Sequence, residues 1–172
     1  MKDMQISKAT RPTRLVPDIR TLCDCPNLAE IIAQWFKDEW GEWPQHQSIE
    51  NSVARLKGRL NTDKAPLTLL AFDNGRAIGT ASLVLREMTT HPELPYWLGD
   101  LYVVPEERGR GVGSALINAI VDQARHFGAD YLYLYTADQM ALYASKGWQT
   151  FIKETYEKHE VEVMRLSLAS PT

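Results

Sequence analysis

The sequence predicts an α+β fold in which one central mixed β-sheet of about seven strands is flanked by about four helices. Three observations predict it. Apolar residues recur at helical spacing in some segments and at strand spacing in others. The first half holds a strong hairpin signal, and the second half places an amphipathic helix between two strand-like segments. An antiparallel hairpin and a parallel crossover in one sheet make that sheet mixed.

The N-terminal third is expected to contain one strand and two helices. Residues 1–15 carry several basic side chains and little apolar periodicity, which is typical of an arm or an extra edge strand. A short strand follows within residues 16–22. Asn27 is expected to cap a helix that ends at Gly41, and Ser48 is expected to cap a second helix that continues through Leu60.

The remaining elements follow from a change of period. Residues 67–72 and 77–85 are strand-like and flank Asn74 and Gly75, which favour a tight hairpin turn. The other expected elements are a strand over residues 97–104, a helix from about 111 to 128, a strand over 131–135, a short helix over 139–146 and two strands within 148–168. Residues 16–172 are expected to form a single domain, because 172 residues match one ordinary domain.

Composition excludes several function classes. The net charge of −3 gives no broad positive field for nucleic acid. No apolar run approaches the roughly 20 residues of a membrane span. Cys23 and Cys25 lie too close together for an ordinary disulfide, and the four histidines show no metal-ligand spacing. A cytoplasmic protein with no metal, no nucleic acid and no membrane partner is expected.

The chemistry is expected at residues 108–113, RGRGVG, which join a strand to a helix. Helix N-termini present unpaired N–H groups, and glycines let a phosphate approach the backbone, so this junction predicts a diphosphate cradle. A glycine-rich turn that only closes a tight corner is the alternative. Ser114 follows Gly113 where a P-loop needs lysine, and neither Ser114 nor Leu116 completes a dinucleotide fingerprint.

Two stretches resemble the GNAT superfamily of N-acetyltransferases: residues 101–116, LYVVPEERGRGVGSAL, and residues 143–148, YASKGW. The resemblance implies a GNAT-like domain and acetyl-coenzyme A as the acetyl donor. It places the pyrophosphate on the backbone of residues 108–113 and the pantetheine arm along the strand that ends at Val104. The implied donor-binding residues are Leu101, Val103, Val104, Arg108, Gly109, Arg110, Gly111, Val112, Gly113, Ser114 and Tyr143.

The resemblance also implies the catalytic groups. Tyr143 matches the tyrosine that protonates the departing thiolate. An alkyl amine is neutral only about once in 2,500 molecules at pH 7, so a base is expected as well. Many relatives carry a glutamate where this chain has Gly99, which makes the neighbouring Asp100 the first candidate. Glu87, Glu39 or a water relay remain alternatives. A further departure is Thr136, where many relatives place an asparagine.

The acceptor is expected to be a primary amine of a small molecule or a peptide, acetylated directly in a ternary complex. The resemblance places the loop after the first helix beside the acceptor cleft, and acids beside tryptophans attract a cationic amine, so Glu39, Trp40 and Trp43 are candidate acceptor-binding residues. Glu87 is a further candidate, because it follows the strand that ends near Leu85. Trp40 covering the core at an ordinary helix end is the alternative interpretation. A non-catalytic acyl-coenzyme A sensor and a protein for another nucleotide remain rival functions, and the chain is expected to be a monomer or a homodimer.

Overall fold

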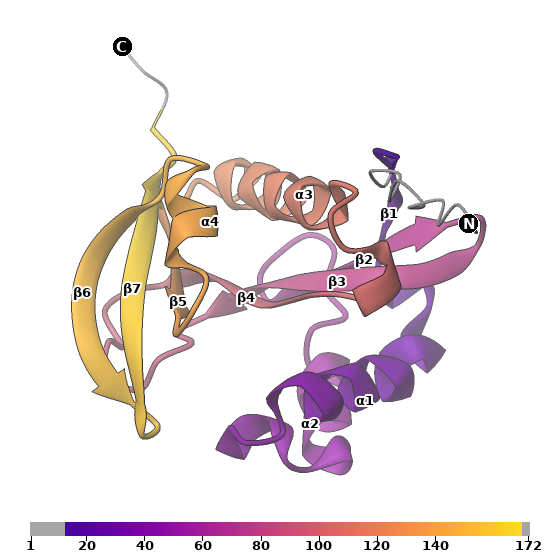
Figure 1. The fold of residues 1–172 in the computed structure, drawn as a ribbon, viewed down its shortest axis with the longest axis horizontal. Helices are drawn as coiled ribbons and strands as arrows, with labels where there is room; N and C mark the ends of the chain where they lie inside the picture. The colour runs from indigo at the N-terminus through magenta and orange to yellow at the C-terminus, as the bar shows by residue number, and fades with distance from the viewer. Residues whose placement is uncertain (1–12, 170–172) are drawn as a thin grey trace, which may run out of the picture.

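A computed structural model describes residues 13–169, which form a seven-stranded sheet with helices on both faces (Figure 1). The sheet order is β1-β2-β3-β4-β5-β7-β6. Every neighbouring pair is antiparallel except β4 and β5, which are parallel. Most of the expected N-terminal segment, residues 1–12, lies outside the described residues. The mixed α+β sheet expected from the sequence is confirmed.

The strands and helices occur in the order expected from the sequence. The strands are β1 (Asp18–Thr21), β2 (Leu67–Asp73), β3 (Arg76–Leu85), β4 (Tyr96–Val103), β5 (Tyr131–Thr136), β6 (Gln149–Tyr156) and β7 (His159–Ser167). The α-helices are α1 (Ala29–Trp40), α2 (Ile49–Lys57), α3 (Val112–His126) and α4 (Met140–Ala144). Figure 1 shows α1 and α2 on one side of the sheet and α3 on the other. No helix within residues 13–169 is long and apolar enough to cross a membrane.

The two N-terminal helices begin differently. At α2 the Ser48 hydroxyl accepts a hydrogen bond from the Asn51 N–H at 3.1 Å, as the sequence predicts. At α1 the expected Asn27 cap is wrong. Pro26 starts a 3₁₀ turn that already contains Asn27, and the cap of α1 is Leu28, with no side-chain hydrogen bond. A capping side chain needs an extended backbone, which a residue inside a helical turn does not have.

The β2–β3 hairpin turns at Asn74 and Gly75, as expected. Both residues have positive φ, 48° and 79°, and Asp73 pairs with Arg76 across the turn. This geometry matches the right-handed twist of the two strands, and asparagine followed by glycine tolerates it best.

The opening between β4 and β5 positions the site. The two strands pair only at Trp97 and Tyr133, so β4 leaves β5 beyond that point. The β3–β4 register is irregular between Thr80 and Ser82. The facing stretch of β4 is longer there and contains Asp100, whose φ is 53°. A bulge bends its strand and redirects the neighbouring side chains.

The core lies on both faces of the sheet. The larger buried cluster joins α1, α2 and α3 to β2, β3 and β4, and includes Phe36, Ile78 and Leu116. A second cluster centres on Trp97 beneath the C-terminal strands. Trp97 is fully buried where β4 pairs with β5. It therefore lies at the closed end of the opening between these two strands.

Candidate active site

The loop between β4 and α3 has the backbone that the glycine motif predicts. Gly109 and Gly111 have φ of 78° and 91°, and Gly111 is the N-cap of α3 without a side-chain hydrogen bond. A residue with a Cβ is strained in this left-handed conformation. The first N–H groups of α3 have no partner within the helix, and the positive end of the helix dipole adds to them. The loop can therefore bind an anion.

A cavity of about 400 Å³, here called the cradle cavity, lies along this loop and the end of β4. Its lining includes nine of the predicted donor-binding residues: Leu101, Val103, Arg108, Gly109, Gly111, Val112, Gly113, Ser114 and Tyr143. Beneath Gly113 the space is open, since a Cβ built there would meet only a Val103 methyl group at 3.8 Å.

Two predicted donor-binding residues do not line the cavity. Val104 is 5% exposed, and its N–H donates to the Ile78 carbonyl at 2.9 Å, so its side chain belongs to the core. The Arg110 guanidinium pairs with Glu107, and its Nε donates to the Thr13 carbonyl at 2.9 Å. The spacing of the motif could not show that these partners hold Arg110 away from the cavity.

Arg108 lies on the cavity wall and contacts both β4 and α1. Its Nε donates to the Val103 carbonyl at 2.8 Å, and its guanidinium carbon lies 5.5 Å from the centre of the Tyr102 ring. A guanidinium nitrogen also lies 3.4 Å from the Glu39 carboxylate of α1. Arg108 therefore holds the end of β4 and the C-terminal part of α1 together.

Lys146 is a cradle residue that sequence reasoning missed. Its Nζ donates to the Ser114 hydroxyl at 2.6 Å and adds a positive charge beside the N-terminus of α3. The available signal was its place in the same short stretch as Tyr143, since a cation beside a phosphate cradle strengthens anion binding.

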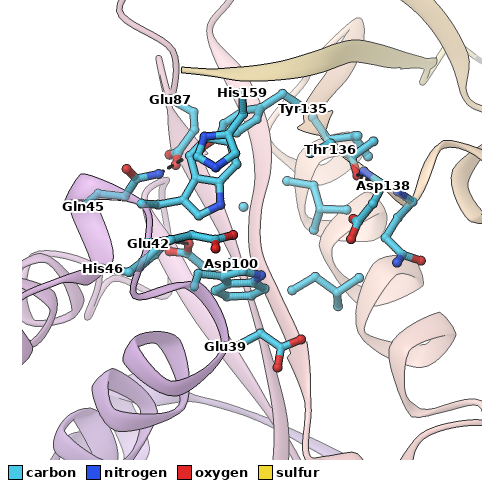
Figure 2. A pocket seen from close by; sticks show the side chains of 18 of the residues that line it. Glu39, Glu42, Gln45, His46, Glu87, Asp100, Tyr135, Thr136, Asp138 and His159 are labelled. Atoms are coloured by element: carbon cyan, nitrogen blue, oxygen red, sulfur yellow. Dashed lines mark hydrogen bonds and ion pairs between the residues drawn. The ribbon is translucent and has the colours of Figure 1, made fainter. Parts of the chain in front are cut away.

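A second cavity, of about 290 Å³, is also lined by Tyr143 and is here called the acidic cavity (Figure 2). All four predicted acceptor-binding residues, Glu39, Trp40, Trp43 and Glu87, line it. Its other carboxylates are Glu42, Asp100 and Asp138. Such a wall favours a cationic ligand.

Aromatic side chains shape the acidic cavity. The Trp43 ring stacks on His159, with ring centres 3.8 Å apart and planes 14° from parallel. Tyr135 accepts a hydrogen bond from Gln45 Nε2 at 3.1 Å, which joins β5 to the segment between α1 and α2. Thr136 also lines the cavity, and its hydroxyl accepts a hydrogen bond from the Gln139 N–H at 3.0 Å. That contact orders the turn before α4.

Tyr143 lies where the two cavities meet, because it lines both. The side chain is buried, and its ring packs edge-on against Trp148 at 5.9 Å. Burial, followed by the negative charge of Asp138, raises the pKa of Tyr143 to about 12. The phenol therefore stays protonated at neutral pH and can donate a proton.

Asp100 lies in a buried ion pair. Its Oδ2 is 2.6 Å from Arg59 Nη1, and its Oδ1 is 3.5 Å from His46 Nε2. Burial alone would raise the pKa of Asp100, but the Arg59 guanidinium beside it outweighs burial and holds that pKa below its usual range. Burial lowers the pKa of His46, so that imidazole favours its neutral form. Asp100 thus remains an ionised partner of Arg59.

Glu87 follows β3 and is partly buried beside β4. Its Oε2 lies 3.7 Å from the position that a Cβ on Gly99 would occupy. Burial, followed by the charge of the nearby Asp100, raises the pKa of Glu87 to about 7. Within residues 13–169 no side chain or backbone group hydrogen-bonds its carboxylate. Glu87 is therefore a partly buried carboxylate without a hydrogen-bonding partner among the described residues.

Metal ligands do not gather in the part of the chain that the structure describes. No group of three or more histidine, cysteine, aspartate or glutamate side chains there has the arrangement needed to hold a metal ion.

Known proteins share both the sequence and the fold. A family model described as "Acetyltransferase (GNAT) family" matches residues 29–148. YhfO, an uncharacterized N-acetyltransferase of Bacillus subtilis (strain 168), is 31% identical over 125 residues, covering 70% of this chain and 83% of the relative.

Solved structures confirm the fold. An aminoglycoside 6'-acetyltransferase type Ii aligns with a TM-score of 0.70 at 16% identity, over 90% of this chain and 99% of its own. The yncA protein of Salmonella typhimurium, solved with acetyl-CoA, aligns with a TM-score of 0.67 at 20% identity, over 92% of this chain and 97% of its own. The sequence match over residues 29–148 and these structural similarities agree: the chain belongs to the acetyltransferase (GNAT) family.

Proposed function

We propose that the protein transfers an acetyl group from acetyl-coenzyme A directly to a primary amine in a ternary complex. One observation carries the proposal: two cavities of different character, one beside a helix N-terminus and one lined by acids, meet at Tyr143. Direct transfer needs donor and acceptor side by side, and cavities that meet supply that arrangement.

The cradle cavity supports the donor assignment. The glycines of residues 109–113 and Lys146 suit a pyrophosphate, because backbone N–H groups and an ammonium both favour negative charge. Beyond Trp97 the β4 edge has no partner strand in β5, so its polar groups are available to the amides of a pantetheine arm. Acetyl-coenzyme A supplies an activated acetyl group. The solved structure of yncA contains the same compound, which supports the choice of ligand.

Tyr143 is proposed as the proton donor for the departing thiolate. Its raised pKa keeps the phenol protonated at neutral pH, so the hydroxyl can hydrogen-bond to the sulfur and donate its proton as negative charge develops there. Its position on the lining of both cavities supports this role, because donor and acceptor would meet beside it.

The acidic cavity supports a cationic amine of a small molecule or a peptide end as the acceptor. Glu39, Glu42 and Asp138 supply negative charge, and Trp40 and Trp43 supply aromatic surface. An aminoglycoside acetyltransferase is among the proteins with this fold, and its name agrees with a cationic acceptor.

Thermal unfolding with acetyl-coenzyme A, coenzyme A, ATP and NAD tests the donor first. A ligand at 100 times its Kd adds about 2.7 kcal/mol of stability. For a protein of this size, each added kcal/mol raises the thermal unfolding midpoint by roughly 2–4 °C. We expect a shift with the two coenzyme A species alone. A shift with ATP or NAD alone would refute the proposal in favour of another nucleotide.

An amine panel with thiol release as readout then tests turnover. Tyr143→Phe is expected to lower kcat by about 10²–10⁴ and to leave acetyl-coenzyme A affinity within about twofold. Tyr131→Phe is the matched control, because Tyr131 is an exposed tyrosine of β5 that lines neither cavity. Binding of the donor without turnover of any amine would instead support the non-catalytic acyl-coenzyme A module, which the glycine at position 99 favours.

A further inference from the structure

We propose that Glu87 is the catalytic base: it takes the proton from the acceptor amine, and it reaches the amine from the segment after β3 rather than from β4. The inference rests on the proposed acetyl transfer. It identifies a catalytic residue that the glycine motif does not contain.

The geometry at Gly99 carries the proposal. A Cβ built on Gly99 would lie 3.7 Å from Glu87 Oε2, 3.8 Å from Glu87 Cδ and 3.1 Å from a Val84 methyl group. The Glu87 carboxylate therefore lies in van der Waals contact with the position that a Cβ at residue 99 would occupy. Both residues line the acidic cavity, so Glu87 brings a carboxylate to the point of β4 where Gly99 has no side chain.

The other acids of the cavity are less suited to the role. Asp100 is held by Arg59 at 2.6 Å, and taking up a proton there would break a buried ion pair. Glu39 lies 3.4 Å from Arg108. Glu42 and Asp138 are exposed, so water competes for their carboxylates. Glu87 alone combines partial burial with a carboxylate free of hydrogen bonds from residues 13–169.

Charged and titratable groups from every neighbouring element act on Glu87. Asp100 of β4 repels its negative charge, whereas Arg55 and Arg59 attract it. Both arginines are already engaged: Arg55 donates to the Gln45 carbonyl at 2.5 Å, and Arg59 binds Asp100. Tyr135 of β5 and the buried His46 line the same cavity as Glu87. Burial raises the pKa of Tyr135 and lowers that of His46.

Burial and Asp100 together hold the pKa of Glu87 at about 7. A base with a pKa near the working pH is effective, because it is substantially ionised and still binds a proton. Glu87 is thus ready to accept a proton at and above neutral pH, whereas an ordinary glutamate would be a much weaker base.

The proposed step balances as follows. The ammonium form of the acceptor gives one proton to the Glu87 carboxylate, and the neutral nitrogen forms a bond to the acetyl carbon. The bond from that carbon to sulfur breaks, and the thiolate takes the Tyr143 proton. The second proton lost by the nitrogen restores Tyr143 through solvent in the cavity, and Glu87 releases its proton to solvent. The products are the acetylated amine, coenzyme A and one proton.

The test compares pH–rate profiles of kcat/KM for the best amine of the panel. In the wild type we expect the rate to rise with pH and level off above about 7, as Glu87 ionises. Glu87→Gln should lower kcat/KM at pH 7 by about 10²–10³. The kcat/KM of this variant should keep rising with pH towards the amine pKa of about 10. Acetyl-coenzyme A affinity should stay within about twofold. Glu93→Gln, an exposed carboxylate between β3 and β4, is the matched control and should behave as the wild type.

A relocated carboxylate gives a second test. In the Glu87→Ala/Gly99→Glu double variant, the new side chain begins beside the space that Glu87 vacates, and the Val84 methyl group 3.1 Å from the new Cβ must move by a few tenths of an ångström. We expect kcat/KM of the double variant to be at least about tenfold higher than that of Glu87→Ala. Its pH profile should level off at a different pH from that of the wild type.

A folded Glu87→Gln protein that keeps the wild-type rate, or that loses rate but keeps a plateau above about pH 7, would overturn the proposal. Wild-type turnover is measured first, which separates the two possible failures. A wild-type protein that binds acetyl-coenzyme A and acetylates no amine would refute the proposed function and the role of Glu87 together. If the wild type acetylates an amine and the Glu87 variants keep its pH–rate profile, only the role of Glu87 as the base is refuted.

Discussion

The Arg59–Asp100 ion pair makes a sharp prediction about the stability of the β4 bulge. The pair is 2.6 Å long, its side chains are 9% and 7% exposed, and Arg59 also donates to the Ser82 hydroxyl at 3.3 Å. Arg59→Met leaves the Asp100 carboxylate buried without its cation. We expect a loss of about 3–5 kcal/mol of unfolding free energy, because removing one partner of a buried pair strands the other charge.

The magnitude is measurable in two ways. Urea unfolding at pH 7 gives the free energy directly, and the thermal midpoint should fall by roughly 6–20 °C, since each kcal/mol moves it by roughly 2–4 °C. Asp100→Asn should cost a similar amount, because it strands Arg59 instead. Lys57→Met is the control, an exposed cation at the end of α2 with no expected effect beyond about 0.5 kcal/mol.

The double variant separates an ion pair from two unrelated contributions. Arg59→Met/Asp100→Asn buries no charge, so its loss should be clearly smaller than the sum of the single losses. Additive losses, or a single-variant loss below about 1 kcal/mol, would refute the reasoning. A folded double variant that still acetylates amines would also show that Asp100 supports the site without acting as its base.

Three further predictions concern the cradle and Glu87. Gly111→Ala should lose about 1–2 kcal/mol, because its φ is 91°, whereas Gly113→Ala should gain about 0.5–1 kcal/mol as a helical residue and yet bind acetyl-coenzyme A more weakly. Urea unfolding measures the stability of both variants, and calorimetric titration measures acetyl-coenzyme A binding. Equal losses of stability in the two variants would contradict the different backbone conformations of the two glycines. Lys146→Met should weaken coenzyme A binding and reduce its dependence on salt, and an unchanged salt dependence would contradict a phosphate contact. In the wild type, ionisation of Glu87 should lower the stability as pH rises from about 4.5 through about 7, because its folded pKa is raised. Relative to the wild type, Glu87→Gln should therefore gain at most about 3 kcal/mol between pH 4 and pH 8.5, and a pH-independent difference would contradict the raised pKa.

Local chemistry explains why several features were predictable. Asn74 and Gly75 favour the positive φ values of a tight hairpin, and Ser48 caps α2 with its own hydroxyl. The left-handed glycines before α3 were likewise predictable, because their conformation and the helix N-terminus depend on neighbouring residues alone. The same local reasoning failed at Asn27, where the preceding proline had already started a helical turn.

The sequence by itself determined the order of strands and helices and predicted the glycine-rich loop and Tyr143 as site residues, because periodicity, turn chemistry and a short motif are properties of neighbouring residues. Only the tertiary structure assigned the carboxylates. Asp100 meets Arg59 across 41 positions, and the bulge with φ of 53° orients its side chain towards that partner. Glu87 gains its place and its raised pKa from burial against β4 and from the charge of Asp100. Burial and electrostatic coupling arise only when distant segments pack together, so no spacing along the chain could distinguish these two acids.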